Sequence, residues 1–162
     1  MTQAPATVRP VTEADLDQLR AMSTRPELGL VDRSHEAQIR GEAVYAVAER
    51  DGAVLGSGVL DLTESAEQPE VKLLFVEPGH RREGLGKALS EFLEAQAREQ
   101  GFTECFLAVD PNNEKMVPMA IDLGYSATGD HRFVEDPDAD QVNHPSLASS
   151  YYAIYRKSLT MR

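Results

Sequence analysis

The chain has 162 residues, the size of one ordinary domain, and it can bury a hydrophobic core without disulfides or a structural metal. Lys and Arg number 16 against 27 for Asp and Glu, so the formal net charge is −11 at pH 7. A surface this acidic repels phosphate backbones and anionic headgroups, which argues against nucleic acids and membrane surfaces as partners. The excess of acidic residues either keeps the protein soluble or favours binding of a cationic partner.

A single cysteine, Cys105, excludes an internal disulfide and a multi-cysteine metal site. It falls in a predicted buried strand, where a thiol is inert. The first five residues lack the apolar core of a signal peptide, and no apolar run approaches the ~20 residues that span a bilayer. We therefore expect residues 1–162 to form a single cytoplasmic domain that binds no metal.

The first half of the chain predicts a helix followed by antiparallel strands. Thr12–Asp15 resembles a capping box, and apolar residues follow it at helical spacing. Residues 23–41 are polar and have only weak helical character. Two runs, Ala43–Glu49 and Ala53–Leu62, flank an Asp-Gly pair, which is a strong hairpin signal. With Glu70–Val76 as a third strand, this part of the chain predicts a meander.

The period of the pattern changes after the third strand. The following segment predicts a helix that ends at Gly101 and carries Leu85, Leu89, Phe92 and Leu93 on one face. Residues 103–109 form another apolar run, short enough for a buried strand. A strand, a long helix and a strand form a crossover unit, which requires a parallel pair inside an otherwise antiparallel sheet.

The remaining segments complete an α+β pattern. A short helical stretch ends at Gly124 and contains Pro118, so it either starts late, with the proline in its first turn, or is kinked. A strand starts at Tyr125, residues 130–150 are polar and aperiodic, and Tyr151–Lys157 is a tyrosine-rich strand. We expect three layers: a mixed, mostly antiparallel central sheet with helices on both faces.

The sharpest chemical signal lies between the third strand and the long helix. A helix N-terminus offers unpaired N–H groups and the positive end of its dipole, so an anion can dock there. Gly84 and Gly86 allow a phosphate to approach these groups closely, and Arg81, Arg82 and Lys87 add positive charge in an acidic chain. The glycine spacing fits neither a P-loop nor a dinucleotide fingerprint.

These residues resemble the GNAT N-acetyltransferases, which use acetyl-CoA. Arg81-x-x-Gly84-x-Gly86 is similar to that family's pyrophosphate loop, and the preceding segment 70–78 is similar to its fourth strand and exit. The resemblance is specific from about Glu70 to Tyr125. It implies a GNAT-like acyltransferase fold with acetyl-CoA as cosubstrate.

The resemblance also implies which residues hold the cofactor. The strand main chain would pair with the pantetheine arm at a splay between two strands, and the loop would bind the pyrophosphate. The implied cofactor-binding residues are Leu74, Phe75, Val76, Arg81, Arg82, Glu83, Gly84, Leu85, Gly86, Lys87 and Asn113. Asn113 competes with a second interpretation, in which it caps the following helix.

The implied reaction is attack of a neutral primary amine on the thioester, without a covalent enzyme intermediate. By resemblance, the Val76 N–H stabilises the oxyanion and Glu70 takes the amine proton. Side-chain alternation puts Glu70 on the face of Lys72, Leu74 and Val76. An exposed strand-end carboxylate is the equal alternative for Glu70.

The sequence departs from the family where a tyrosine often serves as general acid, because that position holds Ala120. Tyr125, Tyr151 and Tyr152 are substitutes, although core packing is the more common role of such tyrosines. The sequence therefore does not identify the general acid, and the thiolate could also take its proton from water.

We predict an N-acetyltransferase acting on a small-molecule or peptide amine, and a non-catalytic acyl-CoA-binding sensor is the alternative. The resemblance leaves a homodimer open. Acidic residues in two regions that flank the acceptor site in the family favour a cationic acceptor. These are Asp32, Glu36, Asp136, Asp138 and Asp140, with Arg33 and His35 beside them.

Overall fold

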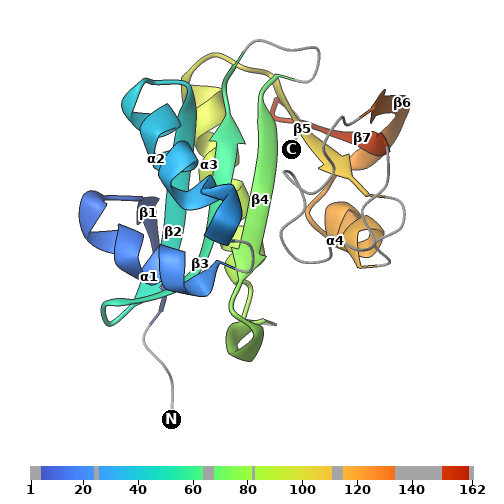
Figure 1. Ribbon diagram of the computed structural model, residues 1–162. Helices are drawn as coiled ribbons and strands as arrows, with labels where there is room; N and C mark the ends of the chain where they lie inside the picture. The colour runs from blue at the N-terminus through green and yellow to red at the C-terminus, as the bar shows by residue number, and fades with distance from the viewer. Residues whose placement is uncertain are drawn as a thin grey trace.

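The computed structural model describes residues 5–23, 26–63, 68–81, 83–110, 115–133 and 151–160. Within them, the strands form one seven-stranded sheet in the order β1-β2-β3-β4-β5-β7-β6, and every neighbouring pair is antiparallel except β4 and β5. Helices lie on both faces of this sheet (Figure 1). The predicted fold class is therefore confirmed, including the single parallel pair.

The elements follow one another with short connections. The strands are β1 (Thr7–Pro10), β2 (Ala43–Arg50), β3 (Ala53–Asp61), β4 (Glu70–Val76), β5 (Glu104–Val109), β6 (Ser126–Phe133) and β7 (Tyr151–Ser158). The α-helices are α1 (Leu16–Met22), α2 (Leu30–Ile39), α3 (Leu85–Glu99) and α4 (Met116–Asp122). Three short 3-10 turns lie at Glu13–Asp15, Pro26–Leu28 and Pro78–His80.

Most elements lie where the sequence predicts them, and the hairpin shows why. Asp51 and Gly52 both adopt positive φ, at 53° and 84°, which is the backbone of the turn type that joins twisted strands tightly. Pro118 is the third residue of α4, so the helix starts late and is not kinked. The short β1 was not predicted, and β6 continues to Phe133, inside the stretch expected to be aperiodic.

Two hydrophobic clusters cover the two faces of the sheet. The larger packs the apolar side of α3, including Leu89 and Leu93, against the sheet and α4. The smaller packs α1 and α2 against β2 and β3 around Tyr45, Val47 and Val59. We refer to these as the α3 face and the α1/α2 face. Cys105 is fully buried on the α3 face, and burial raises the pKa of its thiol to about 12.

Glu94 lies on the buried side of α3, although it is charged. Its carboxylate accepts hydrogen bonds from Ser90 Oγ at 2.8 Å, Tyr125 Oη at 2.9 Å and Lys157 Nζ at 2.9 Å. Lys157 also donates to the carbonyl of Leu123 at 2.9 Å. This buried network ties α3 to the end of α4 and to β7, which fixes the helix whose first turn carries the glycine loop.

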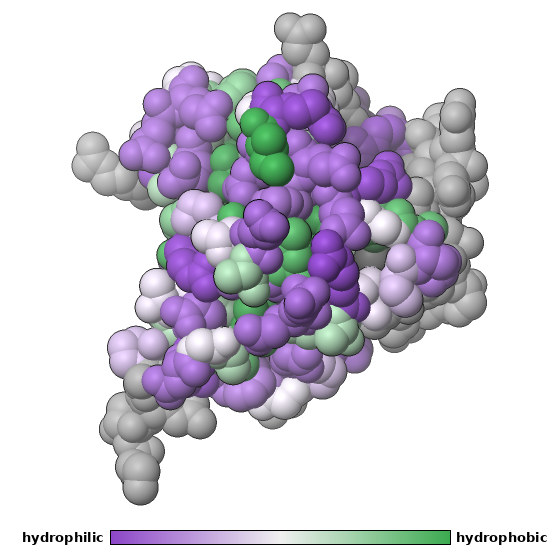
Figure 2. Space-filling view, turned by 60° about the vertical axis from the view of Figure 1, so that its left-hand side comes forward, coloured by the Kyte–Doolittle hydropathy of each residue, from purple (hydrophilic) through white to green (hydrophobic). Residues whose placement is uncertain are grey.

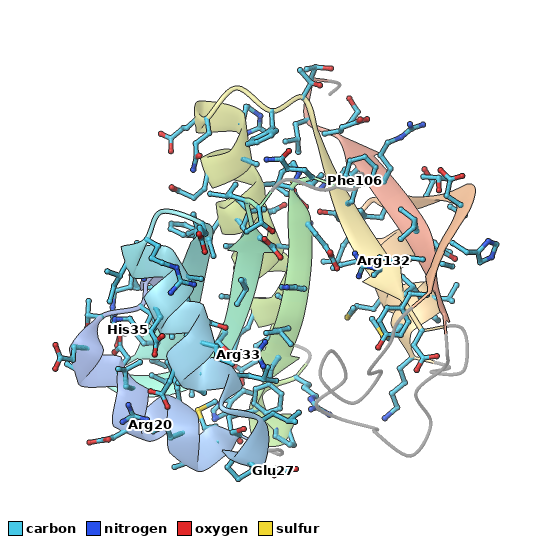
Figure 3. The ribbon with its side chains drawn as sticks, turned by 45° about the horizontal axis from the view of Figure 1, so that its top comes forward. Arg20, Glu27, Arg33, His35, Phe106 and Arg132 are labelled. Atoms are coloured by element: carbon cyan, nitrogen blue, oxygen red, sulfur yellow. The ribbon has the colours of Figure 1, made fainter. Side chains whose placement is uncertain are left out.

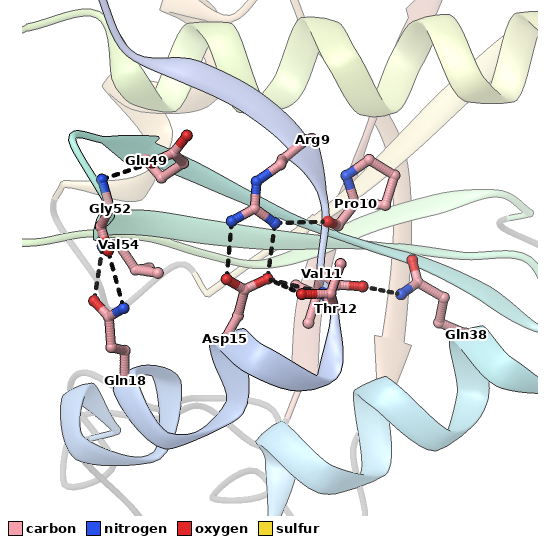
Figure 4. A network of polar contacts seen from close by, with 10 residues as sticks. All are labelled: Arg9, Pro10, Val11, Thr12, Asp15, Gln18, Gln38, Glu49, Gly52 and Val54. Atoms are coloured by element: carbon pink, nitrogen blue, oxygen red, sulfur yellow. Dashed lines mark hydrogen bonds and ion pairs between the residues drawn. The ribbon is translucent and has the colours of Figure 1, made fainter.

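A second network holds α1 and α2 on the opposite face (Figure 4). Arg9 donates to both carboxylate oxygens of Asp15, at 2.8 and 2.9 Å, and the Thr12 N–H donates to the same side chain at 2.8 Å. The side chain of Gln18 bonds the β2–β3 hairpin at Gly52 and Val54. These bonds attach the short α1 to the sheet, because seven residues are too few for a helix that is stable by itself.

Candidate cofactor and acceptor site

The central feature of the site is the divergence of β4 from β5. Their parallel register consists of Glu70 with Phe106 and Val71 with Leu107, supplemented by a bond from Phe106 N–H to Pro69 O at 2.9 Å. Beyond Val71, β4 has no β5 partner, while its other edge remains paired with β3 as far as Val76. The remaining β4 edge can pair with an extended ligand as a further strand would. The strands separate visibly in Figure 1.

A β-bulge in β4 corrects the predicted side-chain pattern. Lys72 opposes Val59 and Phe75 opposes Ser57, so β4 contains one residue more than β3 between these pairs. Leu73 adopts a positive φ of 55°, which suits the extra residue of a bulge. The simple alternation expected along 70–76 is therefore wrong at this point.

The bulge divides the β4 side chains between the two faces. Leu74 and Val76 pack against the cluster of the α3 face. Lys72, Leu73 and Phe75 instead line hollows beneath α2. Glu70 and Lys72 thus do not share a face with Leu74 and Val76.

The end of β4 and the start of α3 lie side by side. A Cβ built on Gly86 would lie 3.9 Å from Val76 Cγ2. Gly84 caps α3 in the left-handed conformation, with φ of 79°, which strongly favours glycine. The open β4 edge and the N–H groups of the first helical turn therefore form one continuous surface of hydrogen-bonding groups.

Several side chains hold the intervening loop. The Arg81 Nε donates to the carbonyl of Val76 at 2.9 Å, and its guanidinium lies 5.9 Å from the centroid of the Phe75 ring. Glu83 accepts from Arg50 at 3.1 Å and from His80 at 3.0 Å. These bonds, with His80 contributing more than Arg50, hold the pKa of the Glu83 carboxyl below its usual range. Arg50 thereby balances the negative charge of Glu83, which lies beside the start of α3.

Glu70 is buried and not a solvent-facing strand end. Its side chain accepts two bonds from Arg132 of β6, one at 2.8 Å to Oε1 and one at 3.1 Å to Oε2. Arg132 thus reaches from beyond β5 to the start of β4, and it supplements the two register pairs that join β4 to β5 (Figure 3). Nothing in the sequence pattern links positions 70 and 132, because the contact depends on the strand order.

Other predicted residues have structural positions. Ala120 is fully buried in the cluster of the α3 face. The Tyr125 hydroxyl donates to Glu94 within the buried network, and burial raises the pKa of that hydroxyl. Five of the residues named from the sequence lie outside the described part of the chain: Arg82, Asn113, Asp136, Asp138 and Asp140. The side chain of Tyr151 is likewise not described.

The described part of the chain contains no cluster of three or more His, Cys, Asp or Glu side chains that would hold a metal ion. None of the described helices is long and apolar enough to cross a membrane.

The fold and site define an α+β protein with an open strand edge that leads to the N-terminus of a long helix. Residues 11–125 match the Acetyltransferase (GNAT) family, and the chain belongs to this family. The family assignment made from the glycine loop is therefore confirmed.

Individual relatives agree with the family assignment. An amino-acid acetyltransferase of Pseudomonas putida is 33% identical over 90 residues, which cover 55% of this chain but only 21% of that protein. The PaiA N-acetyltransferase of Thermoplasma acidophilum, in complex with coenzyme A, has a TM-score of 0.70 at 17% identity, covering 96% and 99% of the two chains. A GNAT acetyltransferase of Elizabethkingia anophelis with bound acetyl-CoA has a TM-score of 0.69 at 16% identity and the same coverage.

Proposed function

We propose that this protein transfers the acetyl group of acetyl-CoA to a primary amine of a small molecule or peptide. The observation that carries the proposal is the continuity between the open edge of β4 and the first turn of α3 at Gly86. The β4 main chain at residues 74–76 would pair with pantetheine, and the N–H groups of residues 84–87 would bind the pyrophosphate. Structural neighbours crystallised with coenzyme A or acetyl-CoA support this choice of cosubstrate.

In the proposed reaction, the amine nitrogen attacks the thioester carbonyl carbon directly. The Val76 N–H stabilises the oxyanion that develops on the carbonyl oxygen. The C–S bond then breaks, and coenzyme A leaves as a thiolate that takes up one proton. The new amide nitrogen loses one proton to a base, so the overall reaction yields an acetamide and free coenzyme A.

We propose Glu70 as that base, acting while it is paired with Arg132. Each carboxylate oxygen has two lone pairs, so two bonds from a guanidinium leave acceptor capacity for a water or the amine. Arg132 fixes the carboxylate in one orientation, which favours proton transfer along a defined path. Glu70→Gln should lower kcat at least tenfold with little change in acetyl-CoA affinity.

Asp61→Asn is the matched control for Glu70→Gln. Asp61 opposes Glu70 in the β3–β4 register and forms an ion pair with Lys72 at 2.8 Å. Both substitutions remove one carboxylate charge from neighbouring positions. Equal kcat values for the two variants would contradict the assignment of Glu70 as base.

The cofactor site has its own test, independent of the acceptor. Gly84→Asp introduces strain at positive φ and a negative charge beside the pyrophosphate, so calorimetry should show at least tenfold weaker binding of coenzyme A. Gly29 is the matched control, because it caps α2 in the same left-handed conformation, with φ of 62°. Coenzyme A affinity that is unchanged in Gly84→Asp would contradict the proposed site.

An acyl-CoA-binding sensor without catalysis is a second candidate. Two observations favour the sensor. A buried alanine, Ala120, stands where members of this family often have a tyrosine, and the Glu70 carboxylate is already paired with Arg132. A thiol-release assay with acetyl-CoA and a broad panel of amines separates the two functions. Coenzyme A binding without acceptor-dependent release across the panel would support the sensor.

A further inference from the structure

A mainly apolar hollow lies between α1/α2 and the sheet, next to the open part of β4. Its volume is about 60 Å³. Since one water-sized group needs roughly 10–15 Å³ on this measure, it has room for a branched aliphatic group or a small ring. The lining side chains are Leu19, Met22, Ser23, Leu30, Val31, Ser34, Tyr45, Ser57, Val59, Leu73 and Phe75.

Three buried residues in this hollow carry hydroxyl groups that make no side-chain hydrogen bond within the described residues. Tyr45 is 4% exposed, and Ser34 and Ser57 are each 9% exposed. Their hydroxyl oxygens are not fully enclosed by protein atoms, so they can bond a ligand that enters the hollow. By contrast, the buried Tyr125 on the other face does donate to Glu94. Convergent polar groups in an apolar pocket are typical of a ligand site.

The charges near the hollow are either paired or displaced from it. Among the described residues, no charged side chain lines it. Asp32 of α2, which the sequence assigned to an acidic acceptor mouth, is paired with Arg20 at 2.6 Å. Figure 3 shows Arg20, Arg33 and His35 on the α1/α2 side of the molecule.

A second, charged hollow continues from the first beneath α2. The two share Leu30, Ser34, Val59 and Leu73 in their linings. The second is lined by both signs of charge, including the ion pairs Arg40–Glu42 and Lys72–Asp61. On the face seen in Figure 2, hydrophilic side chains dominate the surface and hydrophobic ones show between them. Within the described residues, the outer end therefore carries mixed charges.

The apolar hollow is placed to receive a substituent of the acceptor. Phe75, which lines it, directly precedes Val76, the proposed oxyanion donor, and Leu73 enters it because of the β4 bulge. A group bound there would lie beside the β4 residues that would hold the thioester. The bulge therefore directs one side chain into the acceptor hollow while residues 74 and 76 remain on the α3 face.

From this geometry we infer that the acceptor is an amine whose substituent is uncharged and mostly apolar, with one or two hydrogen-bonding groups for Tyr45, Ser34 and Ser57. An aromatic or branched aliphatic amine with a hydroxyl or amide group is of this class. Polyamines and aminoglycosides are excluded, because burying an extra ammonium group without a partner has a high free-energy cost. The inference rests on the proposed function and names the substrate class of that site.

The experiment compares four amines: tyramine, isoamylamine, spermidine and kanamycin. Calorimetry measures binding of each amine to the protein with coenzyme A bound, and a thiol-release assay measures turnover with acetyl-CoA. We expect tyramine and isoamylamine to bind at least tenfold more tightly than spermidine and kanamycin. Tighter binding of either polycation, or no binding of the two apolar amines, would overturn the inference. Binding of the apolar amines without thiol release would leave the inference standing and contradict the proposed function.

Two variants localise the binding. Val31→Asp introduces a charge into the wall and should weaken tyramine binding at least tenfold, whereas Ile39→Asp, on the same helix at a position 72% exposed, should not. Tyr45→Phe keeps the shape of the hollow and should weaken tyramine binding roughly three- to tenfold while isoamylamine binding stays unchanged. Equal effects of Val31→Asp and Ile39→Asp, or no loss of tyramine affinity in Tyr45→Phe, would overturn the assignment of the hollow.

Discussion

The two faces of the sheet differ in how the hydroxyl of a buried tyrosine is bonded. On the α3 face, Tyr125, Ser90 and Lys157 all converge on Glu94, so each buried donor has an acceptor. On the α1/α2 face, Tyr45 borders a hollow and makes no side-chain hydrogen bond within the described residues. The first arrangement stabilises the scaffold that carries the glycine loop, and the second leaves hydroxyls available to a ligand. We therefore expect substitutions in the Glu94 network to lower stability, and substitutions in the wall of the hollow to lower acceptor binding.

The largest effect is expected for Glu94→Ala, because it leaves the Lys157 ammonium without its partner in a mostly buried position. Breaking a buried pair in this way lowers the free energy of unfolding by about 2–4 kcal/mol. Glu91→Ala is the control, since Glu91 lies on the exposed side of α3. Denaturant titration should show the loss for Glu94→Ala only. An equal loss of unfolding free energy in both variants would contradict the stabilising role of the Glu94 network.

Gly56→Ala tests how tightly β3 and β4 pack on the α3 face. A Cβ at Gly56 would lie 2.7 Å from the main-chain oxygen of Phe75, so β4 itself must shift. We expect a loss of about 1–3 kcal/mol in unfolding free energy and at least tenfold weaker coenzyme A binding. At Gly58 the nearest atom is the end of the Leu74 side chain at 2.9 Å, which can rotate away. Gly58→Ala should therefore cause the smaller loss in both measurements.

Asp15→Asn loosens the attachment of α1, which covers the acceptor hollow. The ion pair with Arg9 holds the pKa of Asp15 at about 2, below its ordinary 3.8. A lowered acid pKa gives stability that is present above pH 3.8 and is lost as the pH falls towards 2. The variant should be less stable than the wild type by about 1–2 kcal/mol at pH 7. This difference should shrink below pH 3.8, as measured by urea unfolding at several pH values.

Asp17→Asn is the control for the pH dependence, because Asp17 is exposed and takes part only in a surface ion pair with Arg20. Its stability difference from the wild type should stay below about 0.5 kcal/mol across the same pH range. A constant deficit for Asp15→Asn from pH 7 to pH 2 would show that the ion pair with Arg9 is not the source of its stability.

The smallest expected effects separate the two tyrosines. Tyr125→Phe removes a hydrogen bond to Glu94 and should lower the unfolding free energy by about 1 kcal/mol. Tyr45→Phe removes a hydroxyl that has no protein partner within the described residues, so its stability should change by less than about 0.5 kcal/mol. Thermal unfolding with and without tyramine completes the comparison. Stabilisation by tyramine should weaken in Tyr45→Phe but not in Tyr125→Phe.

Local sequence was sufficient for features whose causes are local. The Asp51-Gly52 turn, the apolar side of α3 and the glycines at its start each follow from conformational preferences within a few residues. The same local character made the family recognisable from the segment between Glu70 and Tyr125, which the match over residues 11–125 confirms.

Tertiary structure decided the features that depend on pairing between distant segments. The β4 bulge requires the β3 register, and it reversed the side-chain pattern that alternation predicts for residues 72–76. Charged residues usually face water, yet Glu94 is buried in the core, where Lys157, 63 residues away, bonds its carboxylate. The pairing of Glu70 with Arg132 likewise depends on a strand order that carries no local signal.

The sequence by itself thus determined the class of fold, the family and the position of the loop proposed to bind the pyrophosphate, because glycine, charge and hydrophobic spacing act over short distances. Only the tertiary structure decided which carboxylates are paired and which hydroxyls remain free. Those outcomes arise where β3, β4, α1 and α2 meet, and no single segment contains them. The excess of negative charge in the composition is for this reason a poor guide to the acceptor, whose proposed hollow is lined by uncharged side chains.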